Sequence, residues 1–282
     1  MSVHDRKLRF GICGLGFMGR TYFTHLRDHS RARVAALCDR DPDRRAGRWN
    51  DAVGNLDAAA ASPTSDGVFA SCAEFDELLA REDVDVVAIT LPTSQHADLT
   101  VRAFSAGKHV LCEKPMALTV ADCDRMIAAA RSARRTLMIA QCIRFWPQYE
   151  VIKREVDAGA IGAVRMASLR RIASPPTYSA GGWLMRAEQS GGAAFDLHVH
   201  DVDFAQHLLG IPESVSAIGR VGASGGVDHV HAHYRYADGR FALIEGGWER
   251  HAPWPFVMEI TVNGEDGTLH WNMNDGRQVL KF

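Results

Sequence analysis

Apolar runs alternate with amphipathic stretches over the first half of the chain. The runs are short and rich in Val, Ile and Leu, which predicts buried strands. The expected strands are Leu8–Cys13, Arg33–Cys38, Val84–Leu91, His109–Cys112 and Leu137–Gln141, with a weaker one at Val68–Ala70. Between them, helical spacing predicts helices near 17–29, 42–52, 75–81, 95–106 and 119–134. This alternation is typical of an α/β fold whose doubly wound parallel sheet is covered on both faces.

The pattern changes after Trp146-Pro147. A helix is expected at 148–158 and another near 193–209, and strand-like runs occupy the remainder. These runs are 162–172, 214–221, 228–236, 240–248, 256–263 and 267–272. The turn signals Ala237-Asp238-Gly239 and Asn263-Gly264 favour hairpins. We expect a first domain over 1–145 and an α+β domain with a mostly antiparallel open sheet over 146–282, while Gly54–Gly67 reads as a loop extension.

A Gly-x-Gly-x-x-Gly turn follows the first strand directly and opens the first helix. In such a turn, Gly14 permits a tight bend, Gly16 lets a pyrophosphate approach the backbone, and Gly19 brings the helix close to the strand. The N–H groups at the helix start, around Phe17 and Met18, attract phosphate. The first domain is therefore predicted to be a dinucleotide-binding Rossmann domain.

Asp39 lies 20 residues beyond Gly19, at the end of the second strand. A carboxylate there can accept hydrogen bonds from both ribose hydroxyls and repel a 2′-phosphate, which favours NAD over NADP. Arg40 could instead pair with that phosphate or stack on adenine, so NADP stays possible. The alternative for Asp39 is a polar turn that caps the next helix.

Two later loops also follow strands, at the sheet edge where ligands bind in doubly wound folds. The loop from Thr90 through Pro92 to His96 lies where a nicotinamide or its ribose could sit, although its Thr and Ser also suit a helix cap. Glu113 and Lys114 follow another strand. An ammonium there could hydrogen-bond a substrate oxygen and stabilise negative charge, although an ordinary loop lysine is the simpler alternative.

A further candidate lies behind the glycine pair Gly191-Gly192. Asp196 and His200 are four residues apart, so they share a face of the predicted helix and could form a general acid/base pair. A zinc site in this region is the alternative; its possible ligands are His198, His200, Asp201, Asp203 and His207. No Cys cluster or His-Glu-x-x-His spacing supports zinc, so we expect no metal.

His229, His231 and His233 alternate along a predicted strand and share one of its faces. Metal binding or an interface is possible there, but polar positions on a sheet face are the preferred interpretation.

Composition excludes several classes of protein. The net charge of −2 argues against nucleic acid or an anionic membrane as the main partner. The first nine residues are polar, and no apolar run approaches the roughly 20 residues that span a bilayer. The six cysteines form no Cys-x-x-Cys pair, which indicates reduced thiols in a cytoplasmic protein.

Taken together, these stretches make the chain resemble the Gfo/Idh/MocA family of oxidoreductases, named for glucose-fructose oxidoreductase and inositol dehydrogenase. The matching motifs are Gly14–Gly19, Thr90–His96, Glu113-Lys114-Pro115 and Asp196-x-x-x-His200 behind the glycine pair, over about residues 8–272. The resemblance implies NAD(P)-dependent oxidation or reduction of sugars, inositols, sugar nucleotides or related polyols. It also implies a second domain whose open sheet packs against another subunit, in a homodimer or homotetramer.

By motif, the resemblance assigns Lys114 as the active-site lysine, Asp196 as a substrate-positioning residue and His200 as the proton acceptor. It places Arg144 and Trp183 near the substrate, with Tyr178 close by. Similar proteins continue past the hairpin at 264–269 with another strand and a helix, whereas this chain stops at Phe282, so the second domain is expected to be shortened.

The sequence thus predicts an NAD-dependent dehydrogenase that acts on a sugar-like or cyclic polyol. One alternative is a non-catalytic NAD(P)-binding regulator of the same fold. Another is a glycosidase or lyase that oxidises its substrate only transiently.

Overall fold

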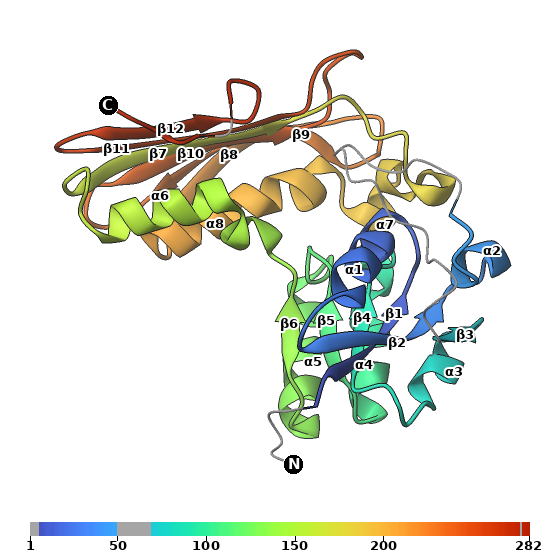
Figure 1. Cartoon of the computed structure of the whole chain (residues 1–282). Helices are drawn as coiled ribbons and strands as arrows, with labels where there is room; N and C mark the ends of the chain where they lie inside the picture. Colours follow the sequence, from blue (N-terminus) through green and yellow to red (C-terminus); the bar gives the residue numbers. More distant parts are fainter. Residues whose placement is uncertain (1–5, 50–68, 277) are drawn as a thin grey trace. The chain divides into compact units, whose positions relative to one another are not determined.

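The computed structural model describes residues 6–49, 69–276 and 278–282, so the loop expected at Gly54–Gly67 lies outside the described residues. The chain divides into two compact units (Figure 1). The first comprises Met1–Ala140 and Tyr178–Trp183, and the second comprises Gln141–Thr177 and Leu184–Phe282. The assignment of one function to each unit stays a prediction.

The first unit is a doubly wound α/β fold. Its elements are β1 (Leu8–Cys13), α1 (Phe17–Arg27), β2 (Ala32–Cys38), α2 (Pro42–Arg45), β3 (Ala70–Cys72), α3 (Phe75–Leu79), β4 (Val86–Ile89), α4 (His96–Ser105), β5 (His109–Cys112), α5 (Val120–Ala133) and β6 (Leu137–Ile139). Within the described residues, its strands form a parallel sheet in the order β3-β2-β1-β4-β5-β6. The parallel sheet predicted from the sequence is confirmed.

Several boundaries differ from the prediction by one or two residues, and two elements differ more. The helix expected near 42–52 ends at Arg45, because Gly47 adopts a φ of 78° that cannot continue a helix. The weak strand expected at Val68–Ala70 is β3, which begins at Ala70.

Alternate residues of the central strands fill two separate cores, because successive side chains of a strand point to opposite faces. Ile12 packs with Phe23 of α1 and Trp49. Its neighbour Cys13 belongs to the other cluster, with Leu99 of α4 and residues of α3 and α5. Helices therefore cover both faces of the sheet, which explains why its strands read as continuous apolar runs.

The second unit contains one large sheet with helices on one face (Figure 1). Its elements are α6 (Pro147–Asp157), β7 (Val164–Ile172), α7 (Ala187–Ser190), α8 (Val199–Leu209), β8 (Ser214–Val221), β9 (Val227–Arg235), β10 (Phe241–Gly247), β11 (Val257–Gly264), β12 (Thr268–Asn272) and β13 (Leu280–Lys281). In the described chain, the strand order is β13-β12-β11-β7-β10-β9-β8, and β7 and β10 are the parallel pair. The predicted α+β fold with a mostly antiparallel sheet is confirmed.

One face of this sheet is covered and the other is open. Tyr149 and Ile152 of α6 and Phe204 of α8 pack against the inward side chains of β7, β9, β10 and β11. On β9, burial alternates: Val230, Ala232 and Tyr234 are buried, and the residues between them face away from the helices. The sheet therefore has an open face on which histidine and charged side chains gather.

No helix in the described part of the chain is long and apolar enough to cross a membrane.

An ion pair fastens the start of the parallel sheet. The Asp85 carboxylate accepts hydrogen bonds from Arg9 Nε at 2.9 Å, from Arg9 Nη2 at 2.7 Å and from the Arg9 backbone N–H at 3.0 Å. Arg6 adds a further contact of 2.6 Å. Hydrogen bonding from Arg9 lowers the pKa of the Asp85 carboxyl from 3.8 to about 2.

We predict that Asp85→Asn lowers the free energy of unfolding of the first unit at pH 7 by about 2 kcal/mol, because the native state then loses its preference for the ionised carboxyl. A carboxyl whose pKa is lowered by folding stabilises the protein above its unfolded pKa. The difference between the two proteins should therefore shrink as the pH falls from 4 towards 2. Urea unfolding across this range measures it.

Asp28→Asn is the matched control, because Asp28 is exposed and pairs only with neighbouring Arg27 in the contacts described. Exposed pairs of this kind contribute little. Equal effects of the two substitutions would contradict the role of Asp85.

Candidate functional site

The glycine turn between β1 and α1 is packed tightly at two positions and open at the third. Gly14 has a φ of 93°, and a Cβ there would lie 2.7 Å from the Thr90 carbonyl oxygen. A Cβ on Gly19 would overlap the Gly14 carbonyl oxygen. By contrast, no heavy atom of the described residues would lie within 4 Å of a Cβ on Gly16. The space over Gly16 is thus available to a ligand.

The helix that starts at this turn presents its N-terminus without a side-chain cap. Gly16 is the N-cap residue, and the first turn of α1, which includes Phe17 and Met18, contains no acidic residue. Its N–H groups and the positive end of the helix dipole favour a phosphate. The binding of pyrophosphate by Gly16, Phe17 and Met18 stays a prediction, which the uncapped helix start permits.

Arg20 stabilises the glycine turn, a role that the sequence did not predict. Its guanidinium is buried, donates to the Leu15 carbonyl at 3.0 Å and lies over the Trp49 ring at 5.5 Å. Thr90, at the end of β4, donates its hydroxyl towards the carbonyls of Cys13 and Gly14 at 2.9 and 2.5 Å. Thr90 therefore holds the turn in addition to lying at the predicted ligand-binding edge.

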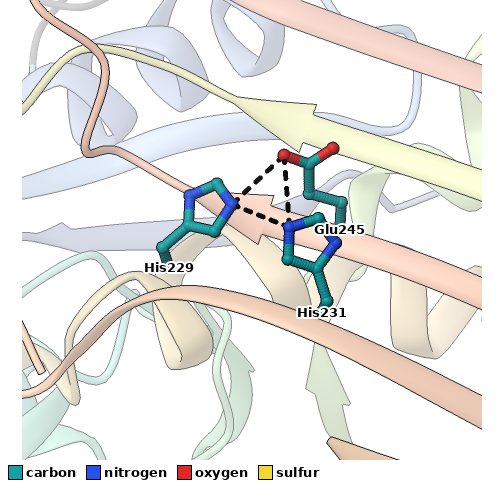
Figure 2. Close-up of side chains that lie close together, drawn as sticks. All are labelled: His229, His231 and Glu245. Atoms are coloured by element: carbon teal, nitrogen blue, oxygen red, sulfur yellow. Dashed lines mark hydrogen bonds and ion pairs between the residues drawn. The ribbon is translucent and has the colours of Figure 1, made fainter. Parts of the chain in front are cut away.

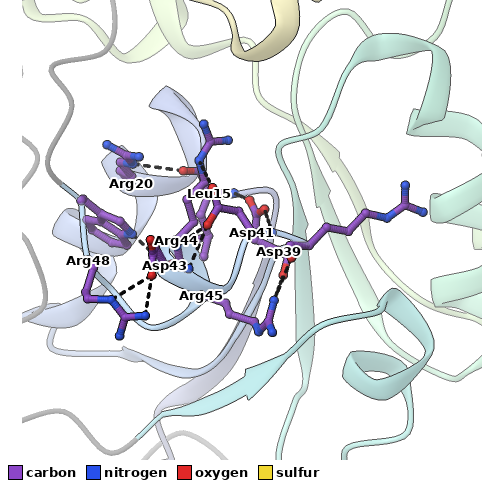
Figure 3. Close-up of polar contacts among 10 residues, drawn as sticks. Leu15, Arg20, Asp39, Asp41, Asp43, Arg44, Arg45 and Arg48 are labelled. Carbon is purple, nitrogen blue, oxygen red and sulfur yellow. Dashed lines mark hydrogen bonds and ion pairs between the residues drawn. The ribbon is translucent and has the colours of Figure 1, made fainter.

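Asp39 reaches the same turn from the end of β2 (Figure 3). Its carboxylate accepts the Leu15 N–H at 2.7 Å and the Asp41 N–H at 2.9 Å. One carboxylate oxygen therefore contacts the glycine turn, and the other forms the polar turn that was the alternative interpretation of Asp39. A carboxylate oxygen has two lone pairs, so these bonds leave it able to accept from a ribose hydroxyl.

The arginines that follow Asp39 point mainly to local partners (Figure 3). Arg45 donates to the carbonyls of Asp39 and Arg40, and Arg48 binds the Asp43 carboxylate. Arg40 itself is 89% exposed and lies 4.0 Å from Glu74. Arg40 is therefore the arginine of this group that could still turn towards a 2′-phosphate.

His96 is buried, with both ring nitrogens next to backbone carbonyls. Nδ1 lies 2.8 Å from the Pro115 oxygen and Nε2 lies 2.9 Å from the Leu91 oxygen. Burial lowers the pKa of His96 despite these carbonyls. The ring joins the loop after β4, which includes Pro92, to the loop after β5, so any contribution to cofactor binding is made through those loops.

Glu113 is buried at the end of β5 and orients the lysine that follows it. Its Oε1 accepts the Tyr22 hydroxyl of α1 at 2.6 Å, and its Oε2 accepts the Lys114 N–H at 3.1 Å. Lys114 is half-buried. The carboxylate predicted to bind cofactor therefore links the nucleotide helix to the candidate catalytic lysine.

A short segment from later in the chain also belongs to the first unit. Tyr178 lies edge-on to Phe17, with ring centroids 6.4 Å apart. Trp183 follows two glycines in the turn Ala180–Met185 and is half-buried. The two aromatic residues that the resemblance placed near the substrate thus belong to the first unit, which also contains the glycine turn.

In the second unit, Asp196 and His200 lie on a distorted helix. Asp196 belongs to a π-helical turn, Ala194–His198, and His200 to the first turn of α8. Such turns often occur at functional sites. Asp196 is half-buried and His200 is buried, and their spacing of four residues keeps them on similar sides of the helix.

Two ion pairs flank His200. Arg171 of β7 binds both oxygens of Asp201 at 2.9 and 3.1 Å, and both side chains are buried. Arg144 binds both oxygens of Asp203 at 2.6 and 2.5 Å, which raises the pKa of Arg144. Arg144 is therefore engaged by a carboxylate of its own unit. The sequence predicted neither pair.

His198, considered as a zinc ligand, lies beneath the sheet. Its Nε2 is 3.3 Å from the Tyr234 hydroxyl, and burial lowers the pKa of His198 to about 4, so the ring is neutral at pH 7. Two carboxylates of the same hypothesis, Asp201 and Asp203, pair with arginines instead. Two histidines and a glutamate do converge elsewhere in the described chain, at His229, His231 and Glu245.

We predict that two alanine substitutions in the glycine turn affect different properties, one dinucleotide binding and the other stability. Gly16→Ala should fold normally and weaken dinucleotide binding at least about tenfold, because its methyl group occupies the open space. Gly19→Ala should lower the free energy of unfolding by about 1–3 kcal/mol, because its methyl group overlaps a carbonyl oxygen. Thermal unfolding and titration with NADH, followed by fluorescence, measure the two effects.

If Gly16→Ala bound NADH normally, the space over Gly16 would not be the pyrophosphate site. Unchanged stability of Gly19→Ala would contradict the packing argument.

Comparison with known families matches both units. The GFO_IDH_MocA family model, described as "Oxidoreductase family, NAD-binding Rossmann fold", matches residues 8–141. A second family model, described as "GFO/IDH/MocA C-terminal domain", matches residues 149–270. The two matches coincide with the parallel sheet that carries the glycine turn and the sheet that carries α8.

Individual proteins agree with these matches. Myo-inositol 2-dehydrogenase of Thermotoga maritima is 30% identical over 272 residues, which are 93% of this chain and 74% of the relative. The 2,7-anhydro-N-acetylneuraminate hydratase of Escherichia coli is 26% identical over 282 residues, 98% of this chain and 70% of that enzyme. The WlbA dehydrogenase from Bordetella pertussis, solved with NADH and UDP-GlcNAcA, superposes with a TM-score of 0.81 at 25% identity, over 96% of this chain and 75% of the other. The chain therefore belongs to the Gfo/Idh/MocA family of oxidoreductases, and its first unit is an NAD-binding Rossmann domain.

Proposed function

We propose that this oxidoreductase transfers a hydride between a nicotinamide cofactor and a hydroxyl or carbonyl carbon of a sugar, an inositol or a sugar derivative. The observation that carries the proposal is the position of Lys114. It follows β5 at the carboxyl edge of the sheet, where the glycine turn also lies, and Glu113 joins it to α1. A cation at this edge can stabilise charge that develops on a substrate oxygen.

NAD is the preferred cofactor in this proposal. The Asp39 carboxylate beside the turn suits a free ribose and repels a 2′-phosphate. The structural relative from Bordetella pertussis was solved with NADH. The exposed Arg40 is the feature that leaves NADP use open, and its contact with Glu74 competes with a phosphate.

The candidate catalytic residues act on different parts of the reaction. Bound NAD⁺ would accept a hydride from the carbon that bears the hydroxyl. Lys114 hydrogen-bonds the substrate oxygen, His200 accepts the hydroxyl proton, and Asp196 orients the substrate or the imidazole. Arg144 acts by holding Asp203 of α8, and Trp183 contributes an aromatic surface for a sugar ring.

A hydratase among the relatives favours a second candidate function. In this second function, oxidation would be transient, the hydride would return to the product, and no NADH would accumulate. The first oxidation step, and the residues that act in it, would be the same in both functions. Net formation of NADH therefore separates the two functions.

The experiment is a substrate panel followed by NADH absorbance, with NAD and NADP in parallel. We expect net reduction of NAD by at least one inositol, sugar or sugar nucleotide. Lys114→Ala should reduce turnover about 10²- to 10⁴-fold while NADH binding changes little, because the lysine acts on the substrate oxygen.

The matched control is Lys153→Ala, because Lys153 pairs with exposed Asp157 on α6. Full turnover of Lys114→Ala would contradict the assigned role. Substrate consumption without net NADH would instead favour the transient mechanism.

We further propose a homodimer or homotetramer formed through the open sheet of the second unit, in the cytoplasm. Every residue of the edge strand β8 is exposed, and Ile218 is 83% exposed. An exposed edge with apolar side chains is a common pairing surface. All six cysteines are thiols, which suits a reducing compartment.

Ile218→Glu should shift the protein towards monomer, because a carboxylate in an apolar interface loses its hydration. Sedimentation velocity measures the shift. Ile211→Glu is the control, since Ile211 is 79% exposed but precedes the strand. An unchanged oligomer in Ile218→Glu would argue against this face.

A further inference from the structure

Two histidines and a glutamate converge on the open face of the sheet in the second unit. His229 and His231 alternate on β9, and Glu245 comes from the neighbouring strand β10, directly opposite His231 in the register. Figure 2 shows the two imidazole rings and the carboxylate turned towards one point. None of these residues has a role in the proposed hydride transfer.

The distances among the three groups match the face of a metal tetrahedron. His229 Nε2 lies 3.2 Å from His231 Nε2 and 3.1 Å from Glu245 Oε1, and His231 Nε2 lies 3.8 Å from the same oxygen. In a tetrahedral zinc site with bonds of about 2.1 Å, neighbouring ligand atoms lie about 3.4 Å apart. An ion could therefore occupy the centre with only small movements of the side chains.

Protons alone satisfy this arrangement poorly. A neutral imidazole carries one N–H, so His229 Nε2 can donate to Glu245 or accept from His231, but it cannot do both. A divalent cation would accept a lone pair from each of the three atoms at once.

The surroundings hold the ligands in place. Arg170 donates to Glu245 Oε2 at 2.6 Å, which leaves Oε1 turned towards the histidines. Arg250 donates to Oε1 at 3.1 Å, so it would share that oxygen with an ion. Gly247 lies opposite His229 in the register, and a Cβ there would overlap the imidazole ring. Hydrogen-bonded carboxylate ligands of this kind are usual in metal sites.

We propose that His229, His231 and Glu245 bind a divalent transition-metal ion of the zinc class. Two imidazoles and one carboxylate suit zinc, cobalt, nickel or copper rather than calcium or magnesium. The fourth position is open on the side of His231, which is 59% exposed and gives the ion a route from solvent. The ion joins β9 to β10 and has a structural role separate from hydride transfer.

The test uses the full chain without a polyhistidine tag, after removal of metal with a chelator. Titration calorimetry with zinc chloride should show one equivalent bound, and zinc should raise the unfolding temperature because it binds the folded state. His231→Ala should weaken zinc binding at least about tenfold and abolish the thermal shift.

His233→Ala is the matched control, because His233 lies on the same face of the same strand but outside the cluster. It should bind zinc as the unaltered chain does. Anomalous diffraction from zinc-soaked crystals should give a peak about 2.1 Å from His229 Nε2, His231 Nε2 and Glu245 Oε1. Equal binding by both variants, or the absence of that peak, would overturn the proposal.

Discussion

The buried ion pair between Arg171 and Asp201 fixes the helix that carries His200. Both side chains are buried, and Arg171 also donates to the Tyr149 hydroxyl at 3.2 Å, so one guanidinium joins β7, α6 and α8. Removing one partner of such a pair costs about 3–5 kcal/mol, whereas replacing both with apolar residues is often neutral. The pair therefore contributes position more than net stability. Because neighbouring helical residues differ by about 100°, locking Asp201 to the sheet also sets the direction of His200.

The first unit uses hydrogen bonds to backbone groups for the same purpose. Asp39 holds the Leu15 N–H, Thr90 holds the Gly14 carbonyl, and Glu113 holds the Lys114 N–H. Each side chain comes from the carboxyl end of a different strand, where parallel strands bring loops together. The candidate cofactor-binding residues therefore also fix the backbone conformation of the loops at this edge of the sheet. A bound cofactor would contact loops that these residues already hold in place.

The sequence predicted most of the fold because buried strands and amphipathic helices leave strong periodic patterns. It predicted neither the parallel pairing of β7 with β10 nor the pairs Arg171–Asp201 and Arg144–Asp203. Hairpin signals report only strands that are neighbours in sequence, and each arginine finds its partner 30 or 59 residues away. A buried arginine also has the same sequence signature as an exposed one.

His96 shows a similar limit for the candidate site. Its place in a loop after a strand is equally compatible with a ligand contact and with two backbone carbonyls as neighbours. The structure places it between the Leu91 and Pro115 carbonyls. By contrast, the glycine spacing was informative, because Gly14 and Gly19 meet steric constraints that no other residue satisfies.

The open sheet face combines two features that the sequence separates. Alternation alone placed His229 and His231 on one face, but the third ligand, Glu245, became visible only through the β9–β10 register. The register with β8 places Ile218 directly opposite His231, so the apolar edge and the histidine cluster are neighbours. A second copy of the chain that covers Ile218 would therefore also cover the ion proposed here. The open fourth position would then face that copy, and metal binding and assembly would be thermodynamically linked.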